Sequence, residues 1–397
     1  MDGVLSSDSR TKRKWTMSSL QYSAVITRHG VLSVCLVLAC SPMVDAKGKC
    51  FVGTYVNIHH LCEAGDSIAV REQALRNHLD RVKASGIDVV MPYATTTSGS
   101  ALYPSEILPN HVYSDWDPLR LIVKEASVRG LRVYPVPCVL ACGRDKPAGI
   151  LAKHPEWALC SPGGRPIGHI SPGHPDARAW VVSVMKEIVT RYRPDGLLLD
   201  YMRFNNRPMR LDPHSVALLE KRHRLKYSKL SPDQIQEFKE AELTRLMSRI
   251  SREVRRIQPG IPVAIYSWGP HVVKGHRVAQ DWRTWASKGY IDMVNISGYC
   301  YRKNYGDRYL KVFEKRLRGA VEINKALGSP VEITFCLGIR TSHGHITRAQ
   351  EVEDYLKVAK RVEVNGVSMF TWSYLQPFLP MIEERGYLQE FRRSRPR

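Results

Sequence analysis

The feature that most constrains the fold is a regular alternation of short apolar runs with amphipathic segments, beginning at residue 50. Eight runs rich in Val, Ile and Tyr have the length and composition of buried strands. They cover residues 50–58, 87–94, 131–139, 195–202, 262–268, 291–299, 331–339 and 366–374. Segments with helical spacing lie between them, such as 71–85, 117–130 and 175–192. This alternation predicts parallel strands joined by helices.

Eight strand–helix units favour a closed (β/α)8 barrel, a TIM barrel, over an open doubly wound sheet. No Gly-rich phosphate loop follows the first run, so a dinucleotide-binding fold lacks its expected signature. We predict one α/β barrel domain over residues 47–397, with an enlarged helical insertion after the fourth strand. The insertion, with helices at 213–228 and 232–257, is dense in Lys and Arg. It is expected either to roof the active-site face or to form a solvated hairpin.

The N-terminal segment has the pattern of a signal peptide. Basic residues precede the apolar run at 31–40, which is too short to span a bilayer, and small residues follow at Val44 and Ala46. We therefore predict a signal peptide at 1–46, export to the periplasm or the medium, and no stable membrane insertion. Cys40, after Val37-Leu38-Ala39, resembles a lipoprotein box, so lipid anchoring is the minor alternative.

The net charge of +21 is the largest departure from an average composition. Residues 1–46 hold five basic and three acidic residues, so +19 belongs to the remainder. Such a surface attracts anionic partners, including acidic glycans. We expect no nucleic-acid partner, because no recognisable module and no basic patch interleaved with aromatic residues stands out. The seven cysteines after residue 46 show no zinc-ligand spacing, and their odd number leaves at least one unpaired.

The clearest candidate for chemistry is Asp200, at the end of the fourth run. In a barrel the reactive groups lie at the C-terminal ends of the strands. Leu197 to Leu199 form a buried strand, and Asp200 follows with Tyr201 and Arg203 close behind. A nearby arginine keeps a carboxylate ionised, as a nucleophile or a charge-stabilising base requires. The alternative is a structural role as a helix cap or in an ion pair with Arg203.

The same segment, DGLLLDYMRF (195–204), resembles the DG-x-x-x-D-Y-x-R-[YF] motif of bacterial glycosyl-hydrolase-like TIM barrels known as "family 10 glycosylhydrolase". The resemblance extends over about residues 50 to 375. It includes ALYPSEI (101–107), DPLRLIVKEASVRGLRVY (117–134), SPGHPDARAW (171–180) and QDWRTWASKGYIDMVNISGY (280–299). It implies an exported barrel that hydrolyses glycosidic bonds in a polysaccharide, with cell-wall or other surface glycans among the substrates.

Glycoside hydrolysis normally needs two carboxylates. We take Asp200 as nucleophile or stabilising base and Asp281 as the acid, because Asp281 lies in a βα loop inside a matched segment. Glu106 and Glu63 are alternatives. If Asp200 acts alone, an N-acetyl group of the substrate could replace the protein nucleophile. A non-catalytic glycan-binding barrel is the competing hypothesis, and a basic nucleic-acid-binding barrel is a third.

Sugar rings pack on aromatic side chains, and polar groups bind their hydroxyls. Metal-dependent barrel hydrolases typically carry an H-x-H pair at the first strand. This chain has Asn57-Ile58-His59 there, so the pair is missing. We therefore expect no metal and no cofactor. The residues predicted to bind substrate stand at or beyond strand ends: Asn57, His59, Tyr93, Tyr103, Tyr201, Arg203, Trp268, Tyr299 and Trp372.

Overall fold

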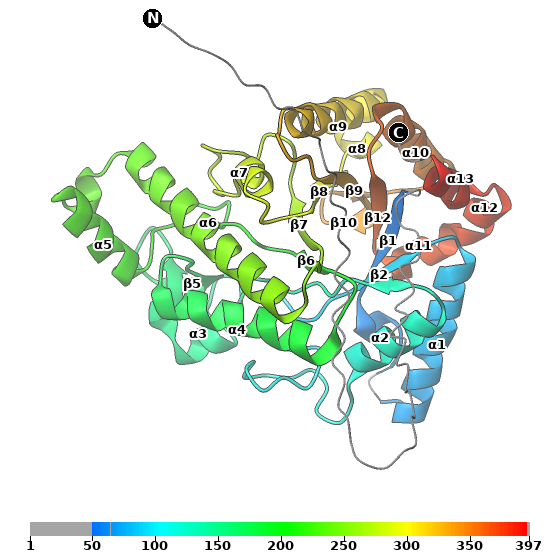
Figure 1. Ribbon diagram of the computed structural model, residues 1–397, viewed down its shortest axis with the longest axis horizontal. Helices are drawn as coiled ribbons and strands as arrows, with labels where there is room; N and C mark the ends of the chain where they lie inside the picture. Colours follow the sequence, from blue (N-terminus) through cyan, green and yellow to red (C-terminus); the bar gives the residue numbers. More distant parts are fainter. Residues whose placement is uncertain (1–49, 64, 395–397) are drawn as a thin grey trace, which may run out of the picture. The chain divides into compact units, whose positions relative to one another are not determined.

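A computed structural model describes residues 50–63 and 65–394. The predicted signal peptide, with Cys40, lies outside the described residues. Eight parallel strands form the main sheet (Figure 1). They are β1 (Phe51–Val56), β2 (Val89–Pro92), β3 (Arg132–Val133), β6 (Leu197–Leu199), β7 (Val263–Ser267), β8 (Met293–Ser297), β9 (Glu332–Gly338) and β12 (Gly366–Phe370).

The order of the strands is β3-β2-β1-β12-β9-β8-β7-β6, so the first and last strands of the chain are neighbours. Backbone hydrogen bonds then join the two ends of this sheet. Leu198 N donates to Pro135 O over 3.1 Å, Asp200 N donates to Pro137 O over 3.1 Å, and Val139 N donates to Asp200 O over 2.9 Å. The predicted α/β barrel is confirmed, and each of its strands lies within the run expected from the sequence.

Helices surround this sheet (Figure 1). The longer ones are α1 (Ile68–Ala84), α2 (Pro118–Val128), α4 (Pro175–Tyr192), α5 (Pro213–His223), α6 (Pro232–Ile257), α9 (Tyr309–Lys325) and α10 (Ala349–Val362), and the first five of these overlap the helical segments named from the sequence. Shorter ones are α3 (Ile150–Lys153), α7 (Trp282–Ser287), α8 (Arg302–Tyr305), α11 (Trp372–Leu375), α12 (Leu379–Glu384) and α13 (Tyr387–Arg393).

Local sequence signals explain where several helices begin. Ser67, Asp117, Asp212 and Ser231 each accept a hydrogen bond from the backbone N–H three residues on, and proline follows three of them at the first helical position. None of the described helices has the length and hydropathy needed to cross a bilayer.

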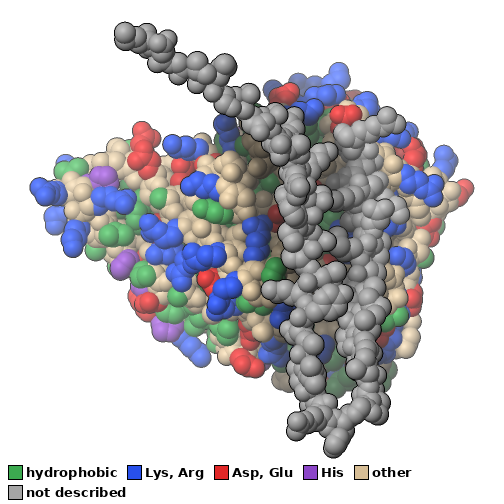
Figure 2. Space-filling view, viewed as in Figure 1, with side chains coloured by type: hydrophobic (Ala, Val, Ile, Leu, Met, Phe, Trp, Pro, Cys, Tyr) green, Lys and Arg blue, Asp and Glu red, His purple; other side chains and the backbone are tan. Residues whose placement is uncertain are grey.

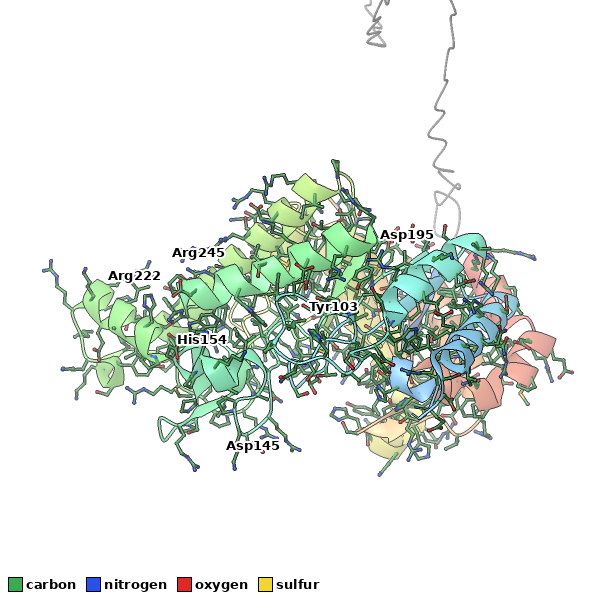
Figure 3. The ribbon with its side chains drawn as sticks, turned by 90° about the horizontal axis from the view of Figure 1, so that it is seen from below. Tyr103, Asp145, His154, Asp195, Arg222 and Arg245 are labelled. Carbon is green, nitrogen blue, oxygen red and sulfur yellow. The ribbon has the colours of Figure 1, made fainter. Side chains whose placement is uncertain are left out.

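Two short antiparallel hairpins interrupt the strand–helix alternation. β4 (Ala158–Cys160) pairs with β5 (Pro166–Ile170), and β10 (Arg340–Thr341) pairs with β11 (Gly344–His345). Figure 3 shows Asp195, just before β6, and Asp145, in the loop after residue 139, on opposite sides of the molecule. The side of the barrel where Asp145 lies, called the loop side below, is therefore the side of the C-terminal ends of the strands. Arg222, near the end of α5, lies far out from the barrel in the same view.

The core has two layers, as a barrel requires. The larger layer packs the outer faces of the strands against the helices, and it includes Leu197, Leu199 and Ile265. The smaller layer fills the barrel interior and includes Leu198, Tyr134 and Met293. Because side chains alternate along a strand, Leu198 and Asp200 share the interior face of β6. The interior packing therefore ends at Asp200 on the loop side.

Candidate active site

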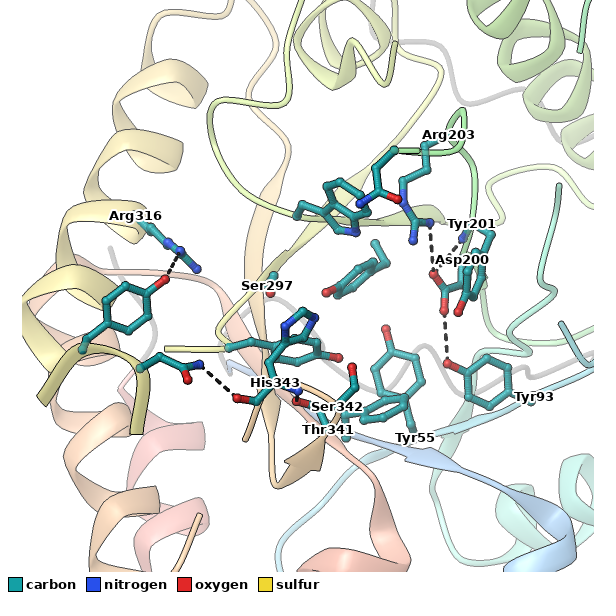
Figure 4. A pocket seen from close by; sticks show the side chains of 17 residues that line it. Tyr55, Tyr93, Asp200, Tyr201, Arg203, Ser297, Arg316, Thr341, Ser342 and His343 are labelled. Carbon is teal, nitrogen blue, oxygen red and sulfur yellow. Dashed lines mark hydrogen bonds and ion pairs between the residues drawn. The ribbon is translucent and has the colours of Figure 1, made fainter. Parts of the chain in front are cut away.

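A cavity of about 530 Å³ lies at the C-terminal ends of the strands (Figure 4). It is lined by Tyr55, Tyr93, Asp200, Tyr201, Arg203, Asn206, Tyr266, Trp268, Ser297, Tyr299, Asn304, Tyr305, Arg316, Thr341, Ser342, His343 and Phe370. The volume is that of a site for a small ligand or a short stretch of polymer. No lining residue among the described ones comes from α5 or α6, so the expectation that these helices roof the cleft is wrong for this cavity.

Asp200 lies at the wall of this cavity and is 8% exposed. Its Oδ2 accepts a hydrogen bond from the Tyr93 hydroxyl over 3.1 Å, and its Oδ1 accepts one from the backbone N–H of Tyr201 over 2.7 Å. Tyr201 has a φ of 52°, in the left-handed region, at the turn that follows the strand. A backbone N–H of the turn itself, that of Tyr201, therefore holds the Asp200 carboxylate in place (Figure 4).

Burial raises the pKa of Asp200 above its ordinary value, although Arg203 and the two hydrogen bonds oppose this shift. From the sequence, the nearby arginine was expected to keep the Asp200 carboxylate ionised. In the structure the guanidinium is a moderate influence, because its Nη1 lies 3.9 Å from Asp200 Oδ1. The loss of water around the carboxylate is the larger effect. A carboxyl group with a raised pKa is suited to proton transfer.

Arg203 is held between two aromatic rings. Its guanidinium carbon lies 4.6 Å from the centre of the Tyr201 ring and 4.8 Å from that of Trp268. The backbone carbonyl of Arg203 accepts a hydrogen bond from His169 Nε2 over 3.0 Å. Burial, with Arg203 nearby, lowers the pKa of His169 to about 3, so the imidazole is neutral at ordinary pH. His169 was not identified from the sequence.

Aromatic rings surround the rest of the cavity. Tyr93, Trp268 and Tyr299, predicted to bind substrate, all line it, and so do Tyr55 and Tyr266, which were not among the predicted site residues. The rings of Tyr55 and Tyr93 lie 5.9 Å apart, and those of Tyr266 and Tyr299 lie 6.2 Å apart. Tyr55 and Tyr266 lie near the C-terminal ends of the predicted runs 50–58 and 262–268, and this position is the sequence signal that could have identified them.

The β10–β11 hairpin supplies a polar wall that sequence reasoning missed. Thr341, Ser342 and His343 line the cavity from it. Asn304 Nδ2 donates to the carbonyl of His343 over 3.0 Å, and the hydroxyls of Tyr301 and Thr341 lie 3.0 Å apart. The loop after β9 therefore closes one side of the cavity (Figure 4). No periodic pattern or motif in the sequence marks these residues.

The structure does not bring Asp281 to Asp200. Asp281 lies outside the Asp200 cavity and accepts hydrogen bonds from the hydroxyl of Thr284 over 2.5 Å and from its backbone N–H over 3.3 Å. It is thus the N-cap of α7, which corrects its assignment as the acid. The alternatives also lie elsewhere. Glu106 has a side chain that is 90% exposed, and Glu63 lines a separate depression beside His59.

Four predicted substrate-binding residues lie outside the cavity. Tyr103 and Trp372 are fully buried, and their polar atoms bond to Glu187 over 2.8 Å and to His78 over 3.2 Å. These two are core residues, because their rings face the helices. Asn57 is half-buried just after β1, and His59 is exposed with its ring 4.3 Å from that of His60.

Among the described residues, no group of three or more His, Cys, Asp and Glu side chains could hold a metal ion. Asp200 is also the only carboxylate among the described residues that line the cavity. The chemistry of the site therefore centres on one buried carboxyl group, the Arg203 guanidinium beside it and a ring of tyrosines.

An eight-stranded α/β barrel with a carboxylate and aromatic rings at the C-terminal ends of its strands is the architecture of glycoside-hydrolase-like barrels. The chain belongs to the family described as Glycosyl hydrolase-like 10, whose model matches residues 51–317. This confirms the resemblance inferred from DGLLLDYMRF and the other segments.

Curated relatives share part of the chain. Glycosyl hydrolase DigH of Escherichia coli (strain K12) is 24% identical over 266 residues, which are 57% of this chain and 57% of that protein. Glycosyl hydrolase YngK of Bacillus subtilis (strain 168) is 23% identical over 240 residues, or 55% of this chain and 44% of that protein. The chain thus spans about half the length of the curated relatives it matches.

Solved structures show the same fold. The glycoside hydrolase domain of PgaB (BpsB) from Bordetella bronchiseptica matches with a TM-score of 0.66 and 16% identity, over 84% of this chain and 97% of that one. Alpha-L-fucosidase isoenzyme 2 from Paenibacillus thiaminolyticus matches with a TM-score of 0.61 and 14% identity, over 85% of this chain and 50% of that one.

Proposed function

We propose that this protein hydrolyses glycosidic bonds in a polysaccharide, and that Asp200 is the reacting carboxyl group. The observation that carries the proposal is a buried carboxyl with a raised pKa, facing a cavity of about 530 Å³ at the C-terminal mouth of the barrel. Membership of the Glycosyl hydrolase-like 10 family supports glycan hydrolysis. The aromatic walls support a sugar ligand, because the C–H faces of pyranose rings pack on such rings.

We propose further that the substrate takes part in the reaction. The usual scheme places a second carboxyl about 5 to 10 Å from the first, and no other carboxylate among the described residues lines the cavity. A 2-acetamido group of the sugar can supply the missing nucleophile. This favours an N-acetylated polysaccharide, such as a bacterial cell-wall glycan. The raised pKa favours Asp200 as acid and base over Asp200 as nucleophile.

The proposed reaction has two steps. Protonated Asp200 gives its proton to the glycosidic oxygen while the acetamide oxygen attacks the anomeric carbon, so the leaving sugar departs as an alcohol. Water then attacks the same carbon and opens the cyclic intermediate, and the Asp200 carboxylate takes the proton of that water. The Tyr93 hydroxyl and the Tyr201 N–H, both bonded to Asp200, hold the carboxyl in place.

We also retain export as part of the proposal, with residues 1–46 as the signal peptide and lipid anchoring at Cys40 as the minor alternative. A glycan outside the cytoplasm is the substrate that such a protein would meet.

The second candidate is a glycan-binding barrel without catalysis. The presence of a single carboxylate among the described lining residues favours it. In that case the aromatic walls and Arg203 bind the polymer, and no bond is broken.

The test is the release of reducing ends from purified N-acetylated cell-wall glycan by the full chain and two variants. Asp200→Asn should lower the rate by at least about 100-fold, because proton transfer is lost. Glu106→Gln is the matched control, since the Glu106 side chain is 90% exposed and lies outside the cavity, and its rate should be unchanged. Chemically deacetylated glycan should not be cleaved.

Retention of activity by Asp200→Asn would remove Asp200 from the mechanism. Cleavage of the deacetylated glycan would exclude assistance by the substrate. If the full chain binds the glycan in a pull-down and releases no ends, the binding-only candidate replaces the hydrolase.

A further inference from the structure

A second concave surface lies between α6, the loop near residue 274 and the end of α7. It has a volume of about 540 Å³, and we call it the α6 groove. Arg245, Arg249 and Arg252 line it from successive turns of α6, and Lys274 and Lys288 line it from the other side. Figure 2 shows Lys and Arg side chains gathered along the part of the molecule where α6 runs, and Figure 3 shows Arg245 on that helix.

The acidic side chains in the groove are already engaged with the protein. Asp281 caps α7, and Glu240 accepts hydrogen bonds from Gln236 Nε2 over 2.8 Å and from the backbone N–H of Gly275. These carboxylates are 5% and 8% exposed by residue, so they offer little surface to a ligand. The accessible charge of the groove is therefore that of its cations.

Three of the five cations lack a carboxylate partner. Arg245 pairs with Glu242, and Arg252 pairs with Glu253 over 3.3 Å. Across residues 50–63 and 65–394, the side chains of Arg249, Lys274 and Lys288 form no ion pair. Like charges that are confined to a concave surface repel one another and focus a positive potential. A bound anion would relieve that repulsion.

The rest of the lining indicates which polyanion fits. Strand-binding sites for nucleic acids combine cations with several stacking rings, and Tyr290 is the single aromatic residue of this groove among the described ones. Surfaces that bind membranes present apolar side chains. The large apolar residues that are exposed elsewhere do not line the groove. Hydroxyl groups, which bond to sugars, line the groove at Thr244, Ser248 and Thr284. The Thr244 hydroxyl accepts from Trp285 Nε1 over 2.9 Å and can still donate, whereas the Thr284 hydroxyl donates to Asp281 and can still accept.

We propose that the α6 groove is a second glycan-binding site, separate from the Asp200 cavity, that takes a polysaccharide with anionic groups on its sugars. The cations bind the anionic groups, and the hydroxyls and Tyr290 contact the sugar rings. The proposal rests on the proposed function only in that both sites would hold the same polymer. It does not require that the bond be broken.

The test measures binding of a fluorescent polygalacturonate oligosaccharide to the full chain by anisotropy at low salt. The triple variant Arg249→Ala/Lys274→Ala/Lys288→Ala should bind about tenfold more weakly. The matched control is Lys311→Ala/Lys315→Ala/Lys325→Ala, which removes the same net charge from exposed positions of α9. The control should bind within about twofold of the unmodified chain.

Equal weakening by the two triple variants would overturn the proposal, because it would assign binding to the overall charge. Single-stranded DNA of similar charge that binds as tightly as the oligosaccharide would overturn the glycan assignment. Equal binding of a neutral dextran oligosaccharide would overturn the role of the cations. Binding should persist in Asp200→Asn. The binding result can therefore be interpreted even if the proposal that Asp200 is catalytic fails.

Discussion

At the scale of single residues, the Asp200 carboxyl is subject to two opposing influences. Removal from water disfavours the charged form, whereas Arg203 and two hydrogen bonds favour it, and the net effect is a raised pKa. The position of Arg203 in turn depends on the two rings beside it and on His169 behind its backbone. His169 is therefore a positioning residue, since it acts on Asp200 only through Arg203.

His169 gives a prediction about pH. Its pKa is lowered to about 3 in the folded protein, from an ordinary value of 6.5. The unfolded chain therefore takes up this proton first as the pH falls, so the stability that the neutral ring contributes is present above pH 6.5 and is lost between 6.5 and about 3. Relative to His169→Gln, which can still donate to the Arg203 carbonyl, the unmodified chain should lose stability more steeply over this window.

The measurement is urea denaturation of both proteins at several pH values. Parallel curves of unfolding free energy against pH would contradict the prediction. In the same variant, a change in the pH profile of glycan cleavage without a change in KM would mark His169 as positioning the reacting group.

At the scale of elements, the loop with ALYPSEI (101–107), one of the segments that carry the family resemblance, is a structural anchor. The Glu187 side chain, on α4, is 7% exposed and accepts three hydrogen bonds. Its donors are Tyr103 Oη over 2.8 Å, Ser105 Oγ over 2.5 Å and the backbone N–H of Glu106 over 2.6 Å. The motif therefore ties the loop after β2 to a helix on the outside of the barrel.

Glu187→Gln should lower the free energy of unfolding by about 1–3 kcal/mol, because a buried acceptor of three hydrogen bonds becomes partly a donor. Glu322→Gln, at an exposed position of α9, is the control and should change it by no more than about 0.5 kcal/mol. Equilibrium denaturation followed by circular dichroism measures both. An effect of Glu187→Gln as small as that of the control would show that the anchor is dispensable.

At the scale of the whole molecule, closure of the sheet decides where the site forms. The hydrogen bonds from 133–139 to 195–200 bring the end of β6 beside the continuation of β3. The carboxylate of Asp195 also accepts a hydrogen bond from Val133 N over 2.8 Å, at the opposite end of the same junction. Asp200 lies at this junction, so the cavity depends on closure as well as on the local turn.

A closed ring leaves no free sheet edge from which strands can separate, so residues 50–394 should unfold in one cooperative transition. Tryptophan fluorescence and far-ultraviolet circular dichroism should give the same midpoint in urea. Separate midpoints would show that the part around β3 and β6 opens independently, against the role we give to closure.

The sequence by itself determined the strand–helix alternation, the barrel, the family and the place of Asp200. These follow from local patterns: the periodicity of apolar residues, the residues that cap helices, and one motif at a strand end. Tyr93, Tyr201, Arg203, Trp268 and Tyr299, which line the cavity, were also named from their positions, because side chains at the C-terminal ends of barrel strands share one face.

Only the tertiary structure decided which candidates meet. Asp281 lies in a βα loop, as expected, but its carboxylate accepts hydrogen bonds from Thr284 and caps α7. Tyr103 and Trp372 follow strands, yet their rings turn into the layer between strands and helices. Hydrogen bonds to Asn304 and Tyr301 hold the hairpin with His343 against the cavity, and no spacing in the sequence indicates these bonds. Spacing along a chain specifies which face a side chain takes within one element, whereas contacts between elements depend on how all eight strands close.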